Sequence, residues 1–275
     1  MTLAPYTLRQ GNHGQEVARL QRTLRIIADG RFGMDTWLHV VACQNDHDLE
    51  PDGIAGPITL AALGIPVLWG VDLSHWQGDD VNYKQLKNAG CSFVYLKATQ
   101  GSSYKHTDWY LRNAERAHAA GLALGAYHFA NPGKNSAVEE ADYFLRTLRR
   151  GPALDLPPVL DMEDRKFGNP LALTVWCAAF LYEIEEWWGS LCGLYTGQSM
   201  VKHHFDPAMV VALARNCWRW APRYGQTNPD PGPVDPWDEW TLWQHTHTAK
   251  VPGVAGNCDL NWLAGGSAGL LGESC

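Results

Sequence analysis

Eight short apolar runs follow one another between residues 69 and 262, and they constrain the fold of this chain more than any other feature. They read as buried strands at residues 69–73, 92–98, 123–129, 158–162, 192–195, 217–221, 240–245 and 259–262. Helical periodicity is clearest between them at residues 110–120 and 138–148. Strands that alternate with helices over about 200 residues predict an α/β fold, a parallel β/α barrel. The last strands have short connections without good helices, so an irregular (β/α) barrel is expected.

Polar and aromatic side chains that could bind or react with a ligand lie at the ends of these predicted strands or, for the last strand, within it. They are Asp72, Lys97, Tyr127, Phe129, Asp161, Glu163, Tyr195, Trp220, Gln244 and Asp259. Barrels of this type carry their active sites where the strands end. Packing alone does not readily explain acids, aromatic rings and hydrogen-bonding groups at so many strand ends. The sequence therefore predicts one functional cleft at this mouth.

The stretch 157–164 places two acids close together, because Asp161 and Glu163 follow a short apolar run at alternate positions. Alternate residues of a strand face the same side, about 6.6 Å apart along the chain. Burial and mutual repulsion are expected to raise the pKa of one carboxyl group and to leave the other low. Hydrolysis of a glycosidic bond needs this division of labour. Alternatively, the two acids cap a loop and pair with Arg165 or Lys166.

The N-terminal part of the chain contains an internal repeat, D-G-x-x-G-x-x-T, at residues 29–36 and 52–59. Asp-Gly favours a tight turn, the second Gly permits close backbone approach, and Thr falls in the first turn of the next helix. An apolar stripe at helical spacing precedes the first copy, at Val17, Leu20, Leu24 and Ile27. These patterns predict a small three-helix all-α domain before the barrel. The expected boundaries are 1–64 for the helical domain, 65–68 for a linker and 69–275 for the barrel.

Charge and composition exclude several function classes. A net charge of −7 without a basic stripe argues against nucleic acid binding. No stretch has the length of a membrane span, and the first six residues lack the pattern of a signal peptide, so neither stable membrane association nor a signal peptide is expected. The seven cysteines form no C-x-x-C pair, which favours reduced thiols. The histidine clusters have no evident acidic or thiol partners, so no metal or other cofactor is expected.

Several motifs of the predicted barrel resemble those of family-25 glycoside hydrolases, the lysozymes called Chalaropsis-type muramidases. The motifs are G-V-D-L-S-H-W-Q-G, Y-L-K-A-T-Q-G, G-A-Y-H-F-A, L-D-M-E, L-Y-T-G, L-W-Q-H-T and C-D-L-N-W, in the family's order and spacing over residues 67–265. The resemblance implies an irregular β/α barrel that cleaves the β-1,4 bond between N-acetylmuramic acid and N-acetylglucosamine. It also implies an acidic cluster of Asp72, Asp161, Glu163 and Asp259. Residues 223–239, which would form one wall of the cleft, match the family less well.

The helical domain is similar to the three-helix peptidoglycan-binding module. The leading pattern L-x-x-G-x-x-G-x-x-V-x-x-L-Q begins at Leu8 and precedes the doubled D-G-x-x-G-x-x-T. This resemblance implies binding to the peptide or glycan portion of bacterial peptidoglycan. The alternative is a helical domain with no ligand of its own, because the repeated residues also serve turns.

On this basis we hypothesise that Glu163 protonates the leaving oxygen and later activates water, while ionised Asp161 orients the substrate's own 2-acetamido group. The alternatives are direct attack by Asp161 or a water activated by Asp259. Asp72 and Asp259 are expected to hold the acids in place, and Lys97 to pair with them or to bond a sugar. The aromatic residues of the cleft either contact sugars or pack in the core, and the sequence leaves both roles possible. Tyr127, Phe129, Tyr195, Trp220 and Gln244 complete the expected substrate site with Lys97.

Two other function classes are alternatives. One is a non-catalytic wall-binding protein, in which the barrel is kept as a lectin. The other is a chitinase-like hydrolase, since those barrels also use a D-x-E strand end. A wall-degrading enzyme without a signal peptide suggests a monomeric phage endolysin for host lysis. It would stay in the host cytoplasm until lysis and then reach the periplasm and cell wall. A bacterial autolysin exported by another route is the alternative.

Overall fold

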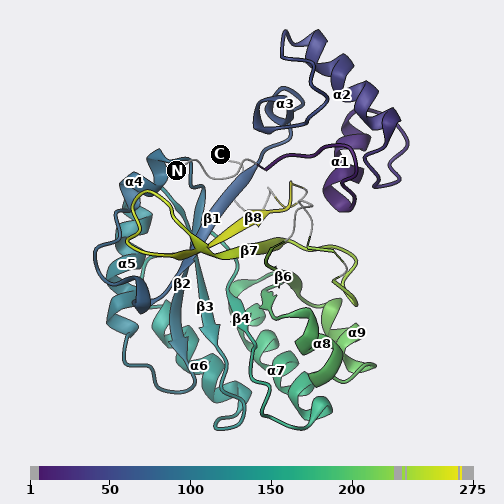
Figure 1. Cartoon of the computed structure of the whole chain (residues 1–275). Helices are drawn as coiled ribbons and strands as arrows, with labels where there is room; N and C mark the ends of the chain where they lie inside the picture. The colour runs from purple at the N-terminus through teal and green to yellow at the C-terminus, as the bar shows by residue number, and fades with distance from the viewer. Residues whose placement is uncertain (1–5, 226–230, 233, 266, 268–275) are drawn as a thin grey trace.

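The computed structural model describes residues 6–225, 231–232, 234–265 and 267, and its strands close into an eight-stranded barrel in chain order (Figure 1). The strands are β1 (Leu68–Leu73), β2 (Phe93–Gln100), β3 (Ala123–Phe129), β4 (Val159–Asp161), β5 (Gly193–Tyr195), β6 (Trp218–Pro222), β7 (Leu242–Ala249) and β8 (Cys258–Leu263). Each predicted strand overlaps one of them. The predicted α/β barrel preceded by a helical domain is thus confirmed.

The direction of β8 departs from the prediction. Strands β1 to β7 pair with one another in parallel, whereas β8 is antiparallel to both β7 and β1. A parallel crossover needs a dozen or more residues, and only residues 250–257 connect β7 to β8. The reversal brings the start of β8 to the mouth where the other strands end. Asp259 consequently pairs in register with Asp72.

The barrel is covered on the outside by helices that connect most of its strands (Figure 1). They are α4 (Tyr83–Asn88), α5 (Thr107–Ala119), α6 (Ala137–Leu148), α7 (Pro170–Trp188), α8 (Gln198–His204) and α9 (Met209–Ala214). Helix α6 shows the local logic: a capping box between Ser136 and Glu139 starts it. Its buried stripe contains Ala141, Phe144, Leu145 and Leu148. A short 3-10 helix, η1 (His75–Gln77), follows β1.

Large aromatic side chains fill the inside of the barrel. Phe93, Tyr95 and Trp220 are each 1% exposed and belong to one apolar cluster. Gly125 in β3 makes room for one of these rings, because a Cβ atom there would lie 2.3 Å from Cε1 of Tyr95. The barrel is therefore a packed core, and only its mouth is open to a ligand.

The N-terminal domain consists of α1 (Gln15–Thr23), α2 (Met34–Asp46) and α3 (Pro57–Ala62), and a glutamine organises each copy of its repeat. Gln21 Nε2 donates to Asp29 Oδ1 and Thr36 Oγ1, and Gly30 N donates to Gln21 Oε1. In the second copy the same bonds link Gln44 to Asp52, Thr59 and Gly53. Both glutamines are 2% exposed. The repeated Asp, Gly and Thr therefore close loops around a buried amide.

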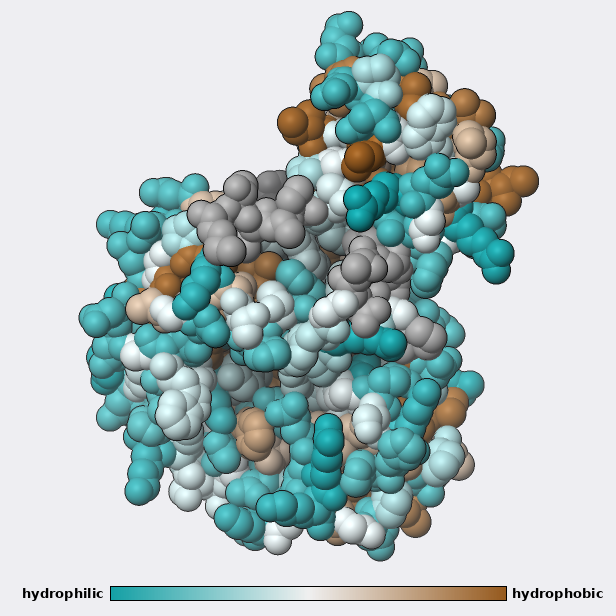
Figure 2. Space-filling model, viewed as in Figure 1, coloured by the Kyte–Doolittle hydropathy of each residue, from teal (hydrophilic) through white to brown (hydrophobic). Residues whose placement is uncertain are grey.

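The helical domain contacts the barrel at the end opposite the mouth. Gln15 exchanges two hydrogen bonds with the backbone of Trp240, just before β7. Gly265 N donates to the carboxylate of Glu16, just after the antiparallel β8. Figure 2 shows the domain as a separate lobe with apolar side chains on its surface. Its exposed apolar residues include Ile27, Met34, Leu38 and Ile58.

Candidate active site

All the site residues predicted from the sequence line one cavity of about 290 Å³ at the mouth of the barrel. The sequence prediction missed three further lining residues, Ser74, Trp76 and Tyr224. Ser74 and Trp76 stand in the motif that follows β1, so their position beyond a strand end was a readable signal. Tyr224 lies in the segment that matches the family poorly and has no such signal.

A chain of hydrogen bonds holds Asp72 on the floor of the cavity. Its Oδ2 atom accepts from Gln244 Nε2 at 2.9 Å and from Asn261 Nδ2 at 2.8 Å. Tyr195 and Tyr224 in turn donate their hydroxyl groups to Gln244 Oε1, at 2.9 Å and 2.6 Å. The sequence prediction also missed Asn261, although its position two residues after Asp259 places both on the same side of β8.

Asp72 and Asp259 face one another across the β1–β8 ladder and are coupled acids. Burial is the main cause that raises the pKa of each. The charge of Asp72 adds to this effect and brings the pKa of Asp259 to about 8. Two carboxyl groups this close do not ionise together, so at neutral pH the pair retains a proton.

Asp161 and Glu163 differ in depth. Asp161 ends β4 and is 8% exposed, whereas Glu163 lies beyond the strand end and is exposed to the cavity. Among the described residues, Asp161 Oδ1 has no hydrogen-bond partner, and neither acid forms an ion pair with Arg165 or Lys166. The alternative that these acids serve as loop caps or surface pairs therefore finds no support.

The pKa values of this second pair differ from the expectation that one stays low. Burial, followed by the charge of Glu163, raises the pKa of Asp161 well above its usual range. Desolvation also raises the pKa of Glu163, while the positive charge of Arg165 opposes the rise. The effect is weaker for Glu163 because solvent in the cavity reaches its carboxyl group. The pair together therefore favours one proton and one negative charge.

Lys97 supplies positive charge beside these acids. Its Nζ atom donates to Gln100 Oε1 at 2.8 Å and lies 4.3 Å from the centre of the Phe129 ring. Burial lowers the pKa of Lys97, and the charges of Asp161 and Glu163 oppose this shift. The ammonium group in turn stabilises a single negative charge on the two acids.

The aromatic residues of the cavity are not equally available to a ligand. Trp220 is 1% exposed, packs against the rings of Tyr95 and Tyr195, and donates its Nε1 hydrogen to Asn261. It therefore forms the floor and leaves almost no open ring face. Tyr127 and Phe129 are half-buried and keep part of their surface in the cavity.

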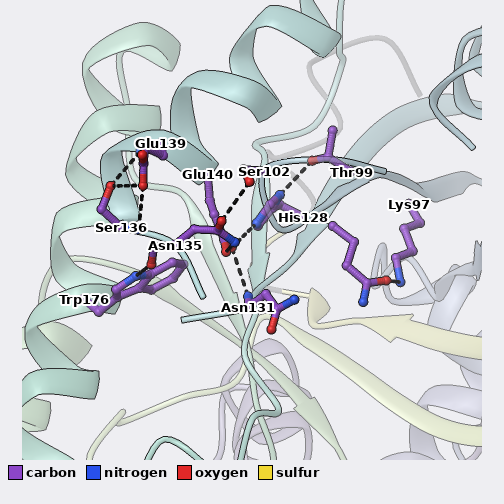
Figure 3. A network of polar contacts seen from close by, with 11 residues as sticks. Lys97, Thr99, Ser102, His128, Asn131, Asn135, Ser136, Glu139, Glu140 and Trp176 are labelled. Atoms are coloured by element: carbon purple, nitrogen blue, oxygen red, sulfur yellow. Dashed lines mark hydrogen bonds and ion pairs between the residues drawn. The ribbon is translucent and has the colours of Figure 1, made fainter. Parts of the chain in front are cut away.

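A second polar network lies behind the cavity wall (Figure 3). The hydroxyl group of Thr99 is hydrogen-bonded to His128 Nδ1 at 2.7 Å, and His128 Nε2 donates to Glu140 Oε2 at 2.8 Å. The backbone N–H of Asn131 and the side-chain amide of Asn135 also donate to Glu140. His128 and Glu140 are completely buried. The network thus ties the ends of β2 and β3 to α6.

The placement of His128 explains why this network bears on the cavity. His128 lies in β3 between Tyr127 and Phe129, and alternate strand residues face opposite sides. A bulge in β2 between Lys97 and Thr99 turns Thr99 toward His128 while Lys97 stays opposite Tyr127. The buried network therefore positions three cavity residues, Lys97, Tyr127 and Phe129, although none of its own side chains lines the cavity.

The described part of the chain contains no cluster of three or more His, Cys, Asp or Glu residues suited to a metal ion. The six described cysteines are buried and unbridged, and Cys275 lies outside the described residues. No described helix is long and apolar enough to cross a bilayer.

A β/α barrel with four carboxyl groups in one cavity at its mouth is typical of the class of glycoside hydrolases. The model for glycosyl hydrolases family 25 matches residues 71–254, and a peptidoglycan binding domain model matches residues 13–63. Lysozyme M1 of Streptomyces globisporus is 33% identical over 224 residues, which cover 74% of this chain and 69% of that protein. The chain therefore belongs to glycosyl hydrolase family 25 and is a lysozyme, or muramidase, that cleaves peptidoglycan.

Two further similarities agree with this assignment. The N,O-diacetylmuramidase of Chalaropsis sp is 29% identical over 64% of this chain and 87% of its own length. The crystal structure of the bacterial lysozyme from Streptomyces coelicolor superimposes with a TM-score of 0.65 at 31% identity. That match covers 75% of this chain and 96% of the other. The barrel thus accounts for nearly the whole of the solved lysozyme, and the helical domain is additional.

Proposed function

We propose that this enzyme cleaves the β-1,4 bond between N-acetylmuramic acid and N-acetylglucosamine, with Glu163 as general acid and then general base. The observation that carries the proposal is the position of Glu163, which is exposed to the cavity, whereas the neighbouring Asp161 is buried beneath it. Glu163 is exposed to the cavity and its pKa is raised, so it can present a proton to a bound glycosidic oxygen.

This scheme places the shared proton on Glu163 and the negative charge on Asp161. Burial raises the pKa of Asp161 and opposes that placement, whereas the charge of Lys97 lowers it and supports the placement. The ionised Asp161 then orients the substrate's 2-acetamido group, whose oxygen attacks the anomeric carbon. The free Oδ1 atom of Asp161 supports this role, since it has an acceptor position to offer to the acetamide N–H. Direct attack by Asp161 is the competing scheme. Activation of a water by Asp259 is disfavoured, because an acid with a pKa of about 8 is mostly protonated at neutral pH.

Mass spectrometry of fragments from purified peptidoglycan tests the bond that is cut. After borohydride reduction, we expect the new reducing ends to be reduced N-acetylmuramic acid. Reduced N-acetylglucosamine would contradict the proposed bond. Proton NMR of the anomer that forms first tests the mechanism. Retention of configuration supports the acetamido scheme or direct attack by Asp161, and inversion overturns both.

We further propose that the enzyme acts as a monomeric phage endolysin, which stays in the host cytoplasm until the membrane is opened. The helical domain would hold it on the wall. An 800 Å³ hollow lined by Gly11, His13, Arg31 and neighbouring residues, together with Asp238 and Glu239 of the barrel, is the candidate wall contact. Cytoplasmic expression in a Gram-negative host should give lysis only after chloroform treatment. Lysis without chloroform would contradict the proposed localisation.

A further inference from the structure

A single tryptophan stands out of the cleft rim beside the catalytic cavity. Trp76 in η1 lines the cavity together with Ser74 and Asp72, yet it is 82% exposed. Single apolar side chains are often exposed on protein surfaces, so the exposure of Trp76 has no meaning by itself. Its position at the rim of the substrate cavity makes the ring available to a bound ligand. The mechanism described above gives Trp76 no role.

The ring is supported from behind by a layer of aromatic side chains. The imidazole of His75 lies 4.6 Å from Trp76, and the imidazole of His106 stacks on His75 at 3.9 Å with an angle of 10°. Tyr104 stands edge-on to both imidazoles and shares a 2.8 Å hydrogen bond with His75 Nδ1. Burial, together with the charges of His106 and Lys97, lowers the pKa of His75 and keeps it neutral for stacking at neutral pH.

The backbone under this layer is fixed as well. Ser74 and Gln77 form a capping box around η1. Trp109 Nε1 donates to Gly78 O at 2.7 Å and closes the turn after η1. Tyr104 N donates to the hydroxyl of Tyr143 in α6 at 2.9 Å. The Trp76 ring is therefore presented by a pre-organised support, which lowers the entropy cost of ligand binding.

The layer is continuous with the catalytic cavity. Lys97 Nζ lies 5.4 Å from the centre of the Tyr104 ring, on the side of the cavity that holds Asp161 and Glu163. The loops after β1 and β2 carry the whole layer, and both lie at the mouth of the barrel. A glycan strand that places one bond at the acids and extends over the β1–β2 rim would meet Trp76 next.

We propose that Trp76, backed by His75, His106 and Tyr104, is a stacking platform for a further pyranose ring of the glycan strand, outside the two sugars that flank the cleaved bond. This inference rests on the proposed function, since it assigns the ligand as the same glycan. The apolar face of a pyranose ring can stack on an exposed indole ring. Trp76 suits such a contact because it carries no charge and the layer behind it is rigid.

Kinetics on two substrates test the platform. For Trp76→Ala we expect kcat/KM on long, peptide-free glycan strands to fall about tenfold through KM, with kcat unchanged. Because Trp76 also lines the cavity, the shortest oligosaccharide that the enzyme cleaves should lose some kcat/KM as well, but clearly less than the long strands, since it does not extend over the rim. Trp76→Phe should recover most of the loss. The matched control is Tyr182→Ala, which removes an exposed ring from α7. Equal values for Trp76→Ala and the native enzyme on long strands, or an equal loss on both substrates, would overturn the platform.

A site-specific measurement separates this inference from the proposed function. In the Glu163→Gln protein, hydroxyl-radical oxidation of Trp76, followed by mass spectrometry, should fall several-fold when long glycan strands are added. Oxidation of exposed Tyr182 should not change. Protection of Trp76 in an enzyme that cuts a different bond would leave the platform standing and refute only the proposed function. Unprotected Trp76 at saturating glycan would refute the platform while cleavage remained intact.

Discussion

The carboxyl group of Asp161 in the cavity and that of Glu140 behind it are both buried, but their surroundings are opposite. Glu140 accepts hydrogen bonds from His128, Asn131 and Asn135, at 2.7 to 2.9 Å. Asp161 leaves Oδ1 without a partner among the described residues, and three other acids share its cavity. Burial by itself therefore does not mark the chemistry. What distinguishes Asp161 is a free acceptor atom in a cavity with three other acids, since such a group can still bond a substrate and exchange a proton.

The largest expected effect tests the cavity side of this comparison. Glu163→Gln keeps the shape of the side chain and removes its proton, so kcat on peptidoglycan should fall about 10²- to 10⁴-fold. The melting temperature should stay near the native value, because the side chain of Glu163 is exposed. Glu186→Gln on the exposed surface of α7 is the control and should keep full activity. Native turnover by Glu163→Gln would refute its assignment as general acid.

For Glu140 we expect the opposite result, a loss of stability. Glu140→Gln turns a side-chain NH₂ group toward buried donors and leaves them unpaired, so the free energy of unfolding should fall by about 3 kcal/mol. Urea denaturation measures this change. The exposed Glu115→Gln in α5 is the matched control, with an expected change within about 0.5 kcal/mol. If Glu140→Gln were as stable as that control, the network would not support the fold.

A smaller effect links the cavity acids to pH. The folded protein holds the proton of Asp259 up to a pKa of about 8, whereas the unfolded chain releases it near 3.8. The unfolded state therefore binds fewer protons between these values, and stability falls as the pH rises from about 4 to 8. Asp259→Asn should remove part of this fall, by about 1 kcal/mol or more between pH 5 and pH 8. Urea unfolding at both pH values checks it, with exposed Asp80→Asn as control. An unchanged slope would mean that Asp259 is ionised in the folded protein.

The smallest effect concerns the hydrogen bonds that hold Asp72. Tyr224→Phe removes one of the two hydroxyl donors to Gln244 Oε1, while Tyr195 still donates to it. One net hydrogen bond corresponds to a loss of about two- to fivefold in kcat. Steady-state kinetics would detect this against Tyr182→Phe, an exposed control on α7. A loss beyond about 100-fold would instead assign Tyr224 a direct part in the reaction.

Much of the fold could be predicted from the sequence, because the local spacing of apolar residues distinguishes buried strands from amphipathic helices. The eight apolar runs and the stripe of α6 are examples. The cavity residues were readable for the same reason, since strand ends in a barrel meet at one mouth. Asn261 and Tyr224 were missed because their role depends on partners distant in sequence, Asp72 and Gln244. Gln21 ends the leading motif of the helical domain, but neither its role nor that of Gln44 as the centre of a repeat was predicted, because their partners lie 8 to 15 residues away.

The sequence by itself determined the α/β barrel, the helical domain before it and the ten residues that gather at the mouth. Each of these follows from local pattern, which the chain encodes over a few turns or strand residues. Only the tertiary structure decided that β8 runs backward, because closure of the barrel and a short connection fix strand direction. That reversal sets Asp259 against Asp72, and the shared burial then raises both pKa values. Depth in the fold, which no local pattern records, separates Glu163 at the surface of the cavity from Asp161 beneath it.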